Sequence, residues 1–366
     1  MGISLPIKVG AVGCGAALEQ LYLRPLRRLE KRGWLKVEVL VEPSERRRSW
    51  AAKAFPGTRI EADAKRAFEG RAIDLAILTS PPPFHGEHAK SAFESGAHVL
   101  SEKPLADKVV AGEQMLEHAR LANRLLAVGM TRRFYPCLAQ ARQLLSSGKL
   151  GRVLKYSYRE GGVYAWPITS TAPFRRETSG GGVLLDKGVH VLDFLYWLFG
   201  PGEIHENQDD SLRGGVEGNS VVKLRHGTVE GLMQLSWDQD LNSGFTISCE
   251  NGEITMPIGP LHDLYLRRLG ESWNRVPVEV NWASDMEAKG GSRGHPRIYY
   301  ECIDFQLIQV LRAILHGESV PVSGSDGLIV LKSIERAYEI ATPMAQNWLP
   351  PAEQDFARRN HWKVGS

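Results

Sequence analysis

Residues 6–18 read Pro-Ile-Lys-Val-Gly-Ala-Val-Gly-Cys-Gly-Ala-Ala-Leu, an apolar run that ends in closely spaced glycines. Apolar and β-branched residues bounded by glycine predict a buried strand, and the apolar spacing of residues 16–31 predicts a helix directly after it. Gly13 and Gly15 allow a tight turn and a close approach of the backbone to a pyrophosphate, and the helix N-terminus supplies N–H donors. Leu18 stands where this pattern usually has a third small residue. The stretch predicts the opening of a dinucleotide-binding fold.

Strands and helices continue to alternate, with short loops, as far as residue 130. The expected strands cover 35–41, 73–79, 98–101 and 125–130, and the expected helices cover 44–55, 63–68, 86–95 and 108–123. This alternation predicts a parallel, doubly wound sheet. Pro25 interrupts the first helix and is expected to bend or restart it. We assign residues 1–131 to an α/β Rossmann domain of this kind.

Polar residues stand where the predicted strands end, at the edge where an open α/β sheet binds its ligand. Thr79 begins a proline-rich run to His85, and Glu102, Lys103 and Pro104 follow the next strand. A proline after Lys103 fixes the turn, and a cis bond there would aim the lysine into the crevice. The alternatives are a histidine that only begins the next helix and a surface lysine before a turn.

The acid at the end of the second strand bears on the choice of cofactor. Glu42 stands about where a carboxylate binds the adenosine ribose, although it could instead be a solvated residue at a strand end. Arg46, Arg47 and Arg48 follow, and an arginine here could bind a 2′-phosphate, which Glu42 would repel, so we favour NAD and keep NADP as a possibility. The expected cofactor contacts are Gly13, Cys14, Gly15, Ala16, Ala17, Glu42, Arg46, Thr79, Ser80, Pro81, Pro82, His85, Glu102 and Lys103.

Residues 180–200 form a second segment bounded by glycines, with three of them before a helix-length apolar run. A helix that is apolar on every side is normally buried. Asp186, His190 and Asp193 nevertheless stand at i, i+4 and i+7, so they share one face. Because unpaired buried charge is costly, this stripe either pairs with basic groups or faces a wet cavity. A capping aspartate with a core histidine is the plainer alternative.

The pattern changes to alternating strands from residue 153 onward. The expected strands cover 153–160, 203–209, 220–225, 228–237, 244–250, 253–257, 264–268 and 275–280, followed by helices over 299–316 and 325–342. His226-Gly227 and Asn251-Gly252 indicate tight hairpins, and Ser323 with Asp326 indicates a capping box. We assign residues 132–346 to an α+β domain with a large, mainly antiparallel sheet, and residues 347–366 to a C-terminal tail.

The segment 161–179 lacks periodicity and is rich in proline, serine and threonine. Loops of this kind often carry substrate contacts, although a disordered surface loop would look similar. Aromatic rings and guanidinium groups suit a sugar ring. The residues proposed for this role are Tyr164, Trp166, Arg175 and Arg176.

Composition limits the class of partner. The 366 residues carry a net charge of +3 with acids and bases interspersed, which gives no reason to propose a nucleic-acid or membrane partner. The four cysteines are far apart, so they indicate no zinc site and no disulfide framework. Neither a signal peptide nor an apolar run long enough to span a membrane is recognised. We expect a cytoplasmic protein without a metal.

Four segments together resemble the glucose–fructose oxidoreductase / inositol dehydrogenase (Gfo/Idh/MocA) family of NAD(P)-dependent enzymes. They are residues 12–15, 80–85, 98–105 and 180–193, and they follow the family's order and spacing. The resemblance covers most of residues 7–345 and implies three catalytic residues at the nicotinamide, namely Lys103, Asp186 and His190. It also implies an oligomer interface on the open face of the second sheet, hence a homodimer or homotetramer. The alternation of Val229, Gly231, Met233, Leu235 and Trp237 is compatible with such an interface, or with a core inside the chain.

These residues suggest a mechanism for hydride transfer to or from a carbinol carbon of a sugar, cyclitol or related polyol. His190 would be the acid/base because imidazole titrates near neutral pH, and Lys103 would bind the reacting oxygen. Asp186 would bind a neighbouring hydroxyl or orient the imidazole, whereas Asp193 is expected to be structural. The alternatives are an NAD-dependent glycoside hydrolase that oxidises its substrate transiently and a non-catalytic dinucleotide-binding regulator.

Overall fold

The computed structural model describes residues 3–70, 73–168, 171–213, 215–279, 296–347 and 349–362. The chain divides into two compact units. Unit 1 consists of residues 1–130 and 303–331, and unit 2 consists of residues 131–302 and 332–366. The first boundary lies next to the one expected from the sequence. Residues 303–331 differ, because the sequence pattern groups them with the second domain.

Unit 1 contains a six-stranded parallel sheet in the order β3-β2-β1-β4-β5-β6. Its strands are β1 (Ile7–Val12), β2 (Leu35–Val41), β3 (Arg59–Glu61), β4 (Leu75–Leu78), β5 (His98–Ser101) and β6 (Leu126–Val128). The order reverses at β1, which confirms the doubly wound prediction. The short edge strand β3 was not predicted, because its three half-exposed residues form no apolar run.

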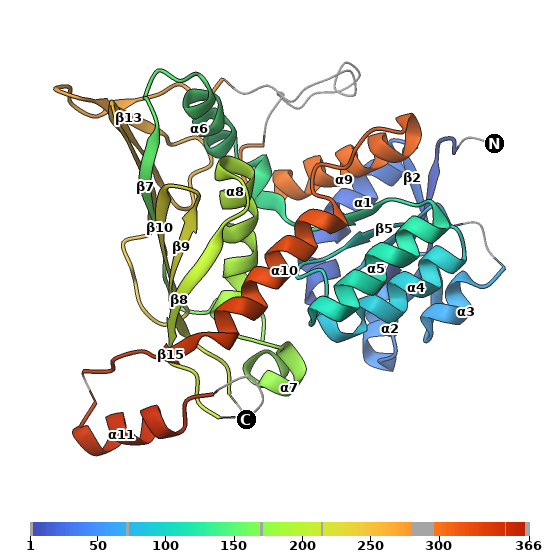
Figure 1. The fold of residues 1–366 in the computed structure, drawn as a ribbon. Coiled ribbons are helices and arrows are strands. Elements are labelled where there is room, and N and C mark those ends of the chain that lie inside the picture. Colours follow the sequence, from blue (N-terminus) through green and yellow to red (C-terminus); the bar gives the residue numbers. More distant parts are fainter. Residues whose placement is uncertain are drawn as a thin grey trace. The chain divides into compact units, whose positions relative to one another are not determined.

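Helices connect these strands (Figure 1). They are η1 (Leu18–Tyr22), α1 (Leu23–Lys31), α2 (Glu45–Ala54), α3 (Ala64–Phe68), η2 (Pro82–Phe84), α4 (His85–Glu94) and α5 (Val109–Ala122). The first helix does change character near Pro25, since η1 is a π-helical turn and α1 begins at Leu23. Asp63 caps α3 by accepting the Arg66 N–H at 2.9 Å. Helices α3, α4 and α5 pack side by side.

The C-terminal part of unit 1 comes from α9 (Tyr299–His316) and α10 (Gly324–Glu339), both of which begin or end in unit 2. The Val128 N–H donates to the Val322 carbonyl at 3.0 Å, which adds backbone pairing beside β6. Ser323 and Asp326 form the predicted capping box, with the Ser323 N–H 2.8 Å from the Asp326 carboxylate. The bond between Val128 and Val322 joins residues 303–331 to the sheet of unit 1.

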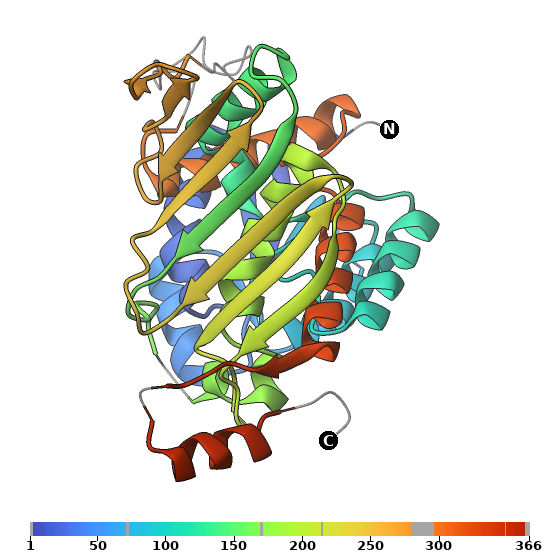
Figure 2. The ribbon, with the colours of Figure 1, turned by 60° about the vertical axis from the view of Figure 1, so that its left-hand side comes forward.

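Unit 2 contains a nine-stranded sheet in the order β14-β13-β12-β11-β7-β10-β9-β8-β15 (Figure 2). Its strands are β7 (Val153–Glu160), β8 (Glu203–Asp209), β9 (Asn219–His226), β10 (Val229–Ser236), β11 (Gly244–Cys249), β12 (Gly252–Pro257), β13 (Tyr265–Arg268), β14 (Asn274–Arg275) and β15 (Ala341–Pro343). Among the described strands of this sheet, β7–β10 and β8–β15 are the pairs that run parallel, so the mainly antiparallel prediction is confirmed. Both predicted hairpins, β9–β10 and β11–β12, are present.

The helices of unit 2 are η3 (Thr131–Phe134), α6 (Pro136–Ser146), η4 (Ala172–Phe174), α7 (Arg176–Ser179), η5 (Leu184–Gly188), α8 (Val189–Phe199) and α11 (Pro351–Arg359). Two local predictions need correction. The helix expected to run to 342 ends at Glu339, and its last residues join the sheet edge as β15. The strand expected over 275–280 ends at Arg275 among the described residues; Val280, and the loop expected over 283–295, lie outside them.

The alternating side chains of β10 belong to the core of unit 2. Met233, Leu235 and Trp237 are 0%, 2% and 8% exposed. Gly231 lies so close to the Tyr156 ring that an added Cβ would be 2.2 Å from it. These residues therefore pack inside the chain and are not available for an interface. Figure 2 shows the opposite face of the sheet, which none of the described helices of unit 2 covers in that view.

Candidate cofactor and catalytic sites

The glycine-rich turn between β1 and η1 is tightly packed on one side and open on the other. Gly13 has a φ of +95°, and an added Cβ would lie 2.5 Å from the backbone nitrogen of Ser80. Any larger residue would therefore push the β4 loop away. An added Cβ at Gly15 meets no atom within 4 Å, so open space borders the turn at the start of η1. That is the arrangement needed to cradle a pyrophosphate.

The carboxylate of Glu42 closes the other side of this turn. It accepts the Cys14 N–H at 2.8 Å and the Ser44 N–H at 2.9 Å, and the residue is only 8% exposed. Each carboxylate oxygen has a second lone pair, so Glu42 can still accept a ribose hydroxyl. Burial, with the Glu42 charge beside it, raises the pKa of the Cys14 thiol to about 12, so Cys14 stays protonated.

Of the arginines that follow β2, the structure brings Arg47 to the turn. Its Nε donates to the Cys14 carbonyl at 2.6 Å, and its guanidinium lies 4.3 Å from the centre of the Trp50 ring. Arg46, which we named from the sequence, is exposed. Three consecutive arginines look alike in sequence, and only the helical phase of α2 separates their directions.

The proline-rich loop after β4 is tied to the neighbouring strand ends. Thr79 Oγ1 donates to the Gly13 carbonyl at 2.6 Å. His85 is fully buried, with Nε2 2.8 Å from the Ser80 carbonyl and Nδ1 3.1 Å from the Pro104 carbonyl. Burial lowers the pKa of His85, so the imidazole is neutral at pH 7. His85 thus links the two loops at this edge. Pro81 and Pro82, at the start of η2, are at least partly exposed to solvent.

Glu102 anchors the backbone at Lys103. Its side chain accepts the Tyr22 hydroxyl at 2.6 Å and the Lys103 N–H at 3.1 Å. Burial raises the pKa of the Glu102 carboxyl. The Lys103–Pro104 bond is cis, and the Lys103 residue is half-buried. Sequence reasoning missed Tyr22, whose position on a π-helical turn follows from no local pattern.

Asp186, His190 and Asp193, which share one helix face, lie in unit 2 on η5 and α8. Asp186 is half-buried, His190 is 8% exposed, and Asp193 is fully buried. Arg133 forms a bidentate ion pair with Asp193, at 2.9 Å from Nε and 2.6 Å from Nη2. A buried carboxylate needs such a partner to be stable, so the pairing agrees with a structural role for Asp193. The turn that carries Asp186 is π-helical, a conformation that is frequent at functional sites.

The loop residues chosen from the sequence separate into different environments. Tyr164 packs edge-on against Trp237, with ring centres 4.9 Å apart. Trp166 is 40% exposed and Arg175 is exposed. Arg176 is instead nearly buried by aromatic rings and Glu217, which the sequence did not single out.

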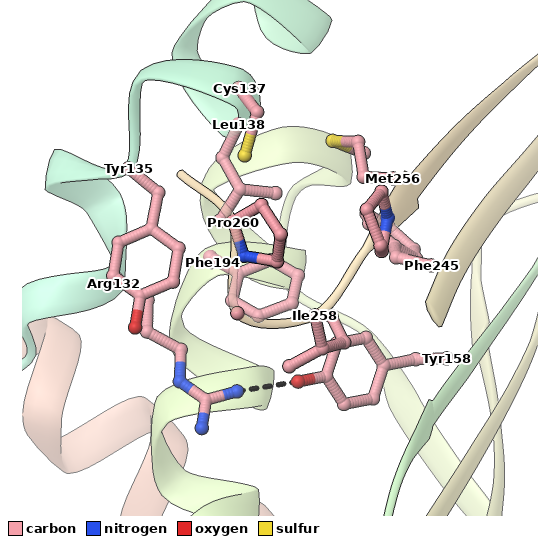
Figure 3. Close-up of a pocket in the computed structure, with 12 residues that line it drawn as sticks. Arg132, Tyr135, Cys137, Leu138, Tyr158, Phe194, Phe245, Met256, Ile258 and Pro260 are labelled. Atoms are coloured by element: carbon pink, nitrogen blue, oxygen red, sulfur yellow. Dashed lines mark hydrogen bonds between the residues drawn. The ribbon is translucent and has the colours of Figure 1, made fainter. Parts of the chain in front are cut away.

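A small cavity in unit 2 is too small for a sugar. It holds about 20 Å³, room for a single water. Figure 3 shows Arg132 donating to the Tyr158 hydroxyl, at 2.5 Å, beside the Phe194 and Tyr135 rings. Arg132 also forms an ion pair with Glu160 at 2.7 Å. Its guanidinium therefore has buried partners, and we interpret this cluster as part of the core.

The described residues give no support for a metal site or for a membrane-spanning helix. No group of three or more His, Cys, Asp or Glu side chains in that part of the chain could hold a metal ion. None of the helices described there is long and apolar enough to cross a membrane.

Family comparisons match both units. The model of an oxidoreductase family with an NAD-binding Rossmann fold matches residues 7–130, and that of the GFO/IDH/MocA C-terminal domain matches residues 138–255. D-glucoside 3-dehydrogenase of Escherichia coli K12 is 26% identical over 54% of this chain and 55% of its own length. Inositol 2-dehydrogenase 2 of Saccharopolyspora erythraea is 27% identical over 58% and 59%. The match thus spans just over half the length of these relatives.

Solved structures share the fold over almost the whole chain. A levoglucosan dehydrogenase in complex with NADH and levoglucosan superposes with a TM-score of 0.78 at 20% identity, covering 91% of this chain and 96% of its own. A 3-ketoreductase from Actinomadura kijaniata, in complex with NADP and TDP-benzene, gives a TM-score of 0.75 at 18% identity, covering 93% of this chain and 99% of its own. At such identities the likeness establishes the architecture of both units.

Proposed function

The chain belongs to the Gfo/Idh/MocA oxidoreductase family, and we propose that it is an NAD(P)-dependent dehydrogenase acting on a sugar, cyclitol or related polyol. The observation that carries this proposal is the turn at Gly13–Gly15, with open space at Gly15 and the buried Glu42 carboxylate beside it. The names of the relatives, a glucoside dehydrogenase and an inositol dehydrogenase, support the substrate class.

A bound nicotinamide cofactor would supply or accept the hydride. The backbone from Gly13 to Ala17 would hold its pyrophosphate at the start of η1. Glu42 would accept a ribose hydroxyl, and its negative charge at a poorly hydrated position would repel a 2′-phosphate. NAD is therefore the proposed cofactor, ahead of NADP.

The substrate would need a proton acceptor and a group that favours its alkoxide form. We assign His190 to take the hydroxyl proton, or return it in the reverse direction, and Lys103 to donate a hydrogen bond to the reacting oxygen. Asp186 would bind a neighbouring hydroxyl or orient the imidazole. Tyr164, Trp166 and Arg175 remain proposals for substrate contact.

The first experiment is a titration of the purified chain with NADH and NADPH, followed by a screen for cofactor reduction with sugars and cyclitols. We expect tighter binding of NADH and turnover on one substrate class. Glycoside cleavage without net NADH formation would instead identify a hydrolase that uses NAD transiently. Cofactor binding without any turnover would favour a regulator.

The acid/base role is tested by His190→Ala. We expect kcat to fall by roughly 10²–10⁴-fold, the usual size of an acid/base contribution, with unchanged affinity for NADH. His205→Ala, an exposed histidine on β8 of the same unit, is the matched control. Wild-type turnover by His190→Ala on the true substrate would refute the assignment.

Two properties of the whole protein belong to the same proposal. A cytoplasmic location is supported by Cys14, Cys137, Cys249 and Cys302, all of which are buried free thiols, as a reducing compartment would keep them. A homodimer or homotetramer through the sheet of unit 2 remains the expected assembly. Sedimentation of the purified chain tests it.

A further inference from the structure

The helical segment that carries Asp186 and His190 begins against a buried carboxylate. Glu217 is fully buried, and its Oε1 accepts the N–H groups of Gly182 at 3.0 Å and Leu184 at 3.1 Å. An added Cβ on Gly182 would lie 2.0 Å from the Glu217 carbonyl oxygen, so this approach requires glycine. The Glu217 side-chain oxygen therefore satisfies amides that the helix leaves unpaired at its start.

Two side chains hold Glu217 in turn. The Tyr338 hydroxyl donates to Oε1 at 2.7 Å, and Nη1 of Arg176 lies 3.4 Å from Oε2. The Arg176 guanidinium carbon is 4.0 Å from the centre of the Tyr338 ring and 3.4 Å from the centre of the Trp362 ring. Arg176 therefore contacts the Glu217 carboxyl group and two aromatic rings, and aromatic ring faces attract a cation.

The segment that supplies Trp362 is fastened to the sheet of unit 2. After α11, the Asn360 carbonyl accepts the Arg213 N–H at 2.8 Å. The His361 imidazole lies 2.8 Å from the Asp209 carboxylate at the end of β8, with both side chains almost fully buried. The Ser211 hydroxyl also donates to that carboxylate, at 2.6 Å. These contacts hold the backbone of residues 360 and 361, next to Trp362, against unit 2.

We propose that the C-terminal segment 351–362 positions the catalytic helix, because Trp362 holds Arg176 against Glu217 and Glu217 holds the amides at the start of η5. Glu217, Arg176 and Trp362 are positioning residues, since each acts on Asp186 and His190 through the backbone. The inference rests on the proposed function, which assigns the chemistry to those two side chains.

This arrangement gives Arg176 a role different from the substrate contact suggested by its place in the sequence. A substrate-binding arginine would affect KM, and Trp362 would matter only through stability. A positioning arginine would affect kcat, and replacement of Trp362 would reproduce its effect. The two possibilities can therefore be separated by kinetics.

The test compares Trp362→Ala with Trp273→Ala in the full chain. Trp273 is the matched control because its ring also packs on an arginine, Arg267 at 4.8 Å, but on β13 and away from η5. We expect Trp362→Ala to lower kcat roughly 10-fold or more, as misplacement of catalytic groups does, with unchanged affinity for NADH. Trp362→Phe, which keeps an aromatic ring, should recover most of kcat.

Hydrogen exchange supplies a readout that needs no substrate. Amides of residues 182–188 should exchange faster in Trp362→Ala than in Trp273→Ala, at temperatures where circular dichroism finds both variants folded. Faster exchange in a protein with no dehydrogenase activity would uphold the positioning chain and reject the proposed function. Equal exchange in the two variants, or a change confined to KM, would overturn the inference.

Discussion

Replacing Glu217 by glutamine should remove a pH-dependent loss of stability. Burial, with the neighbouring Asp209 charge, raises the pKa of the Glu217 carboxyl from 4.5 to about 7, against the opposing effect of Arg176 and the Tyr338 hydroxyl. A folded-state pKa above the unfolded one means that the folded protein holds the proton more tightly. The contribution of Glu217 to the free energy of unfolding is therefore at its maximum below pH 4.5. It is lost as the pH rises through the folded-state pKa of about 7.

The loss amounts to about 3 kcal/mol at most, from about 1.4 kcal/mol for each pH unit of difference between the two states. Glutamine keeps an oxygen that can accept the Gly182 and Leu184 amides, and it stays neutral at every pH. We therefore expect the stability of Glu217→Gln relative to wild type to rise by about 2 kcal/mol between pH 5 and pH 8.

The assay is urea unfolding at several pH values, followed by tryptophan fluorescence, for wild type, Glu217→Gln and the control Glu353→Gln. Glu353 is exposed on α11, so its replacement should leave the pH dependence unchanged. A stability difference between wild type and Glu217→Gln that is the same at pH 5 and pH 8 would refute the reasoning.

Three further predictions concern single residues. Asp193→Asn leaves the buried Arg133 guanidinium without its anion and should lower the free energy of unfolding by about 3–5 kcal/mol, measured by chemical denaturation. Gly13→Ala should abolish NADH binding in calorimetry, because its Cβ would collide with the Ser80 backbone, and wild-type affinity would contradict this. Glu42→Ala should raise kcat/KM with NADP relative to NAD, since it removes the charge that repels a 2′-phosphate; an unchanged ratio would exclude Glu42 as the determinant.

Local patterns in the sequence predicted many of the elements. The Ser323–Asp326 capping box and the hairpin at Asn251-Gly252 depend on residues close together in the chain, so their spacing is sufficient. The strand β15 and the π-helical turn η5 were missed. The three residues of β15, which pair in parallel with β8, have no pattern of their own. The π-helical turn η5 lies in a run that is apolar on nearly every side, so the run has no periodicity that could separate it from the α-helix that follows.

The candidate site was predictable only in part. Glu42 and Lys103 could be named because a parallel sheet places its ligand at the ends of its strands. The contacts that hold these sites in place could not be predicted. They are the bond of Arg47 to the glycine-rich turn and the bond of Tyr22 to Glu102. The Arg47–Cys14 contact joins residues 33 positions apart, and the Tyr22–Glu102 contact joins residues 80 positions apart. The packing of the elements therefore decides which side chains meet.

The sequence by itself determined the two kinds of sheet, the glycine-rich turn and the residue types proposed for hydride transfer. Periodicity and glycine spacing decide these features because they act over a few residues. Only the tertiary structure decided that Arg176 meets Glu217 and Trp362, and that β10 faces a core inside the chain. Burial and long-range pairing decide such contacts, because a charged side chain leaves water only where the fold brings its partners together.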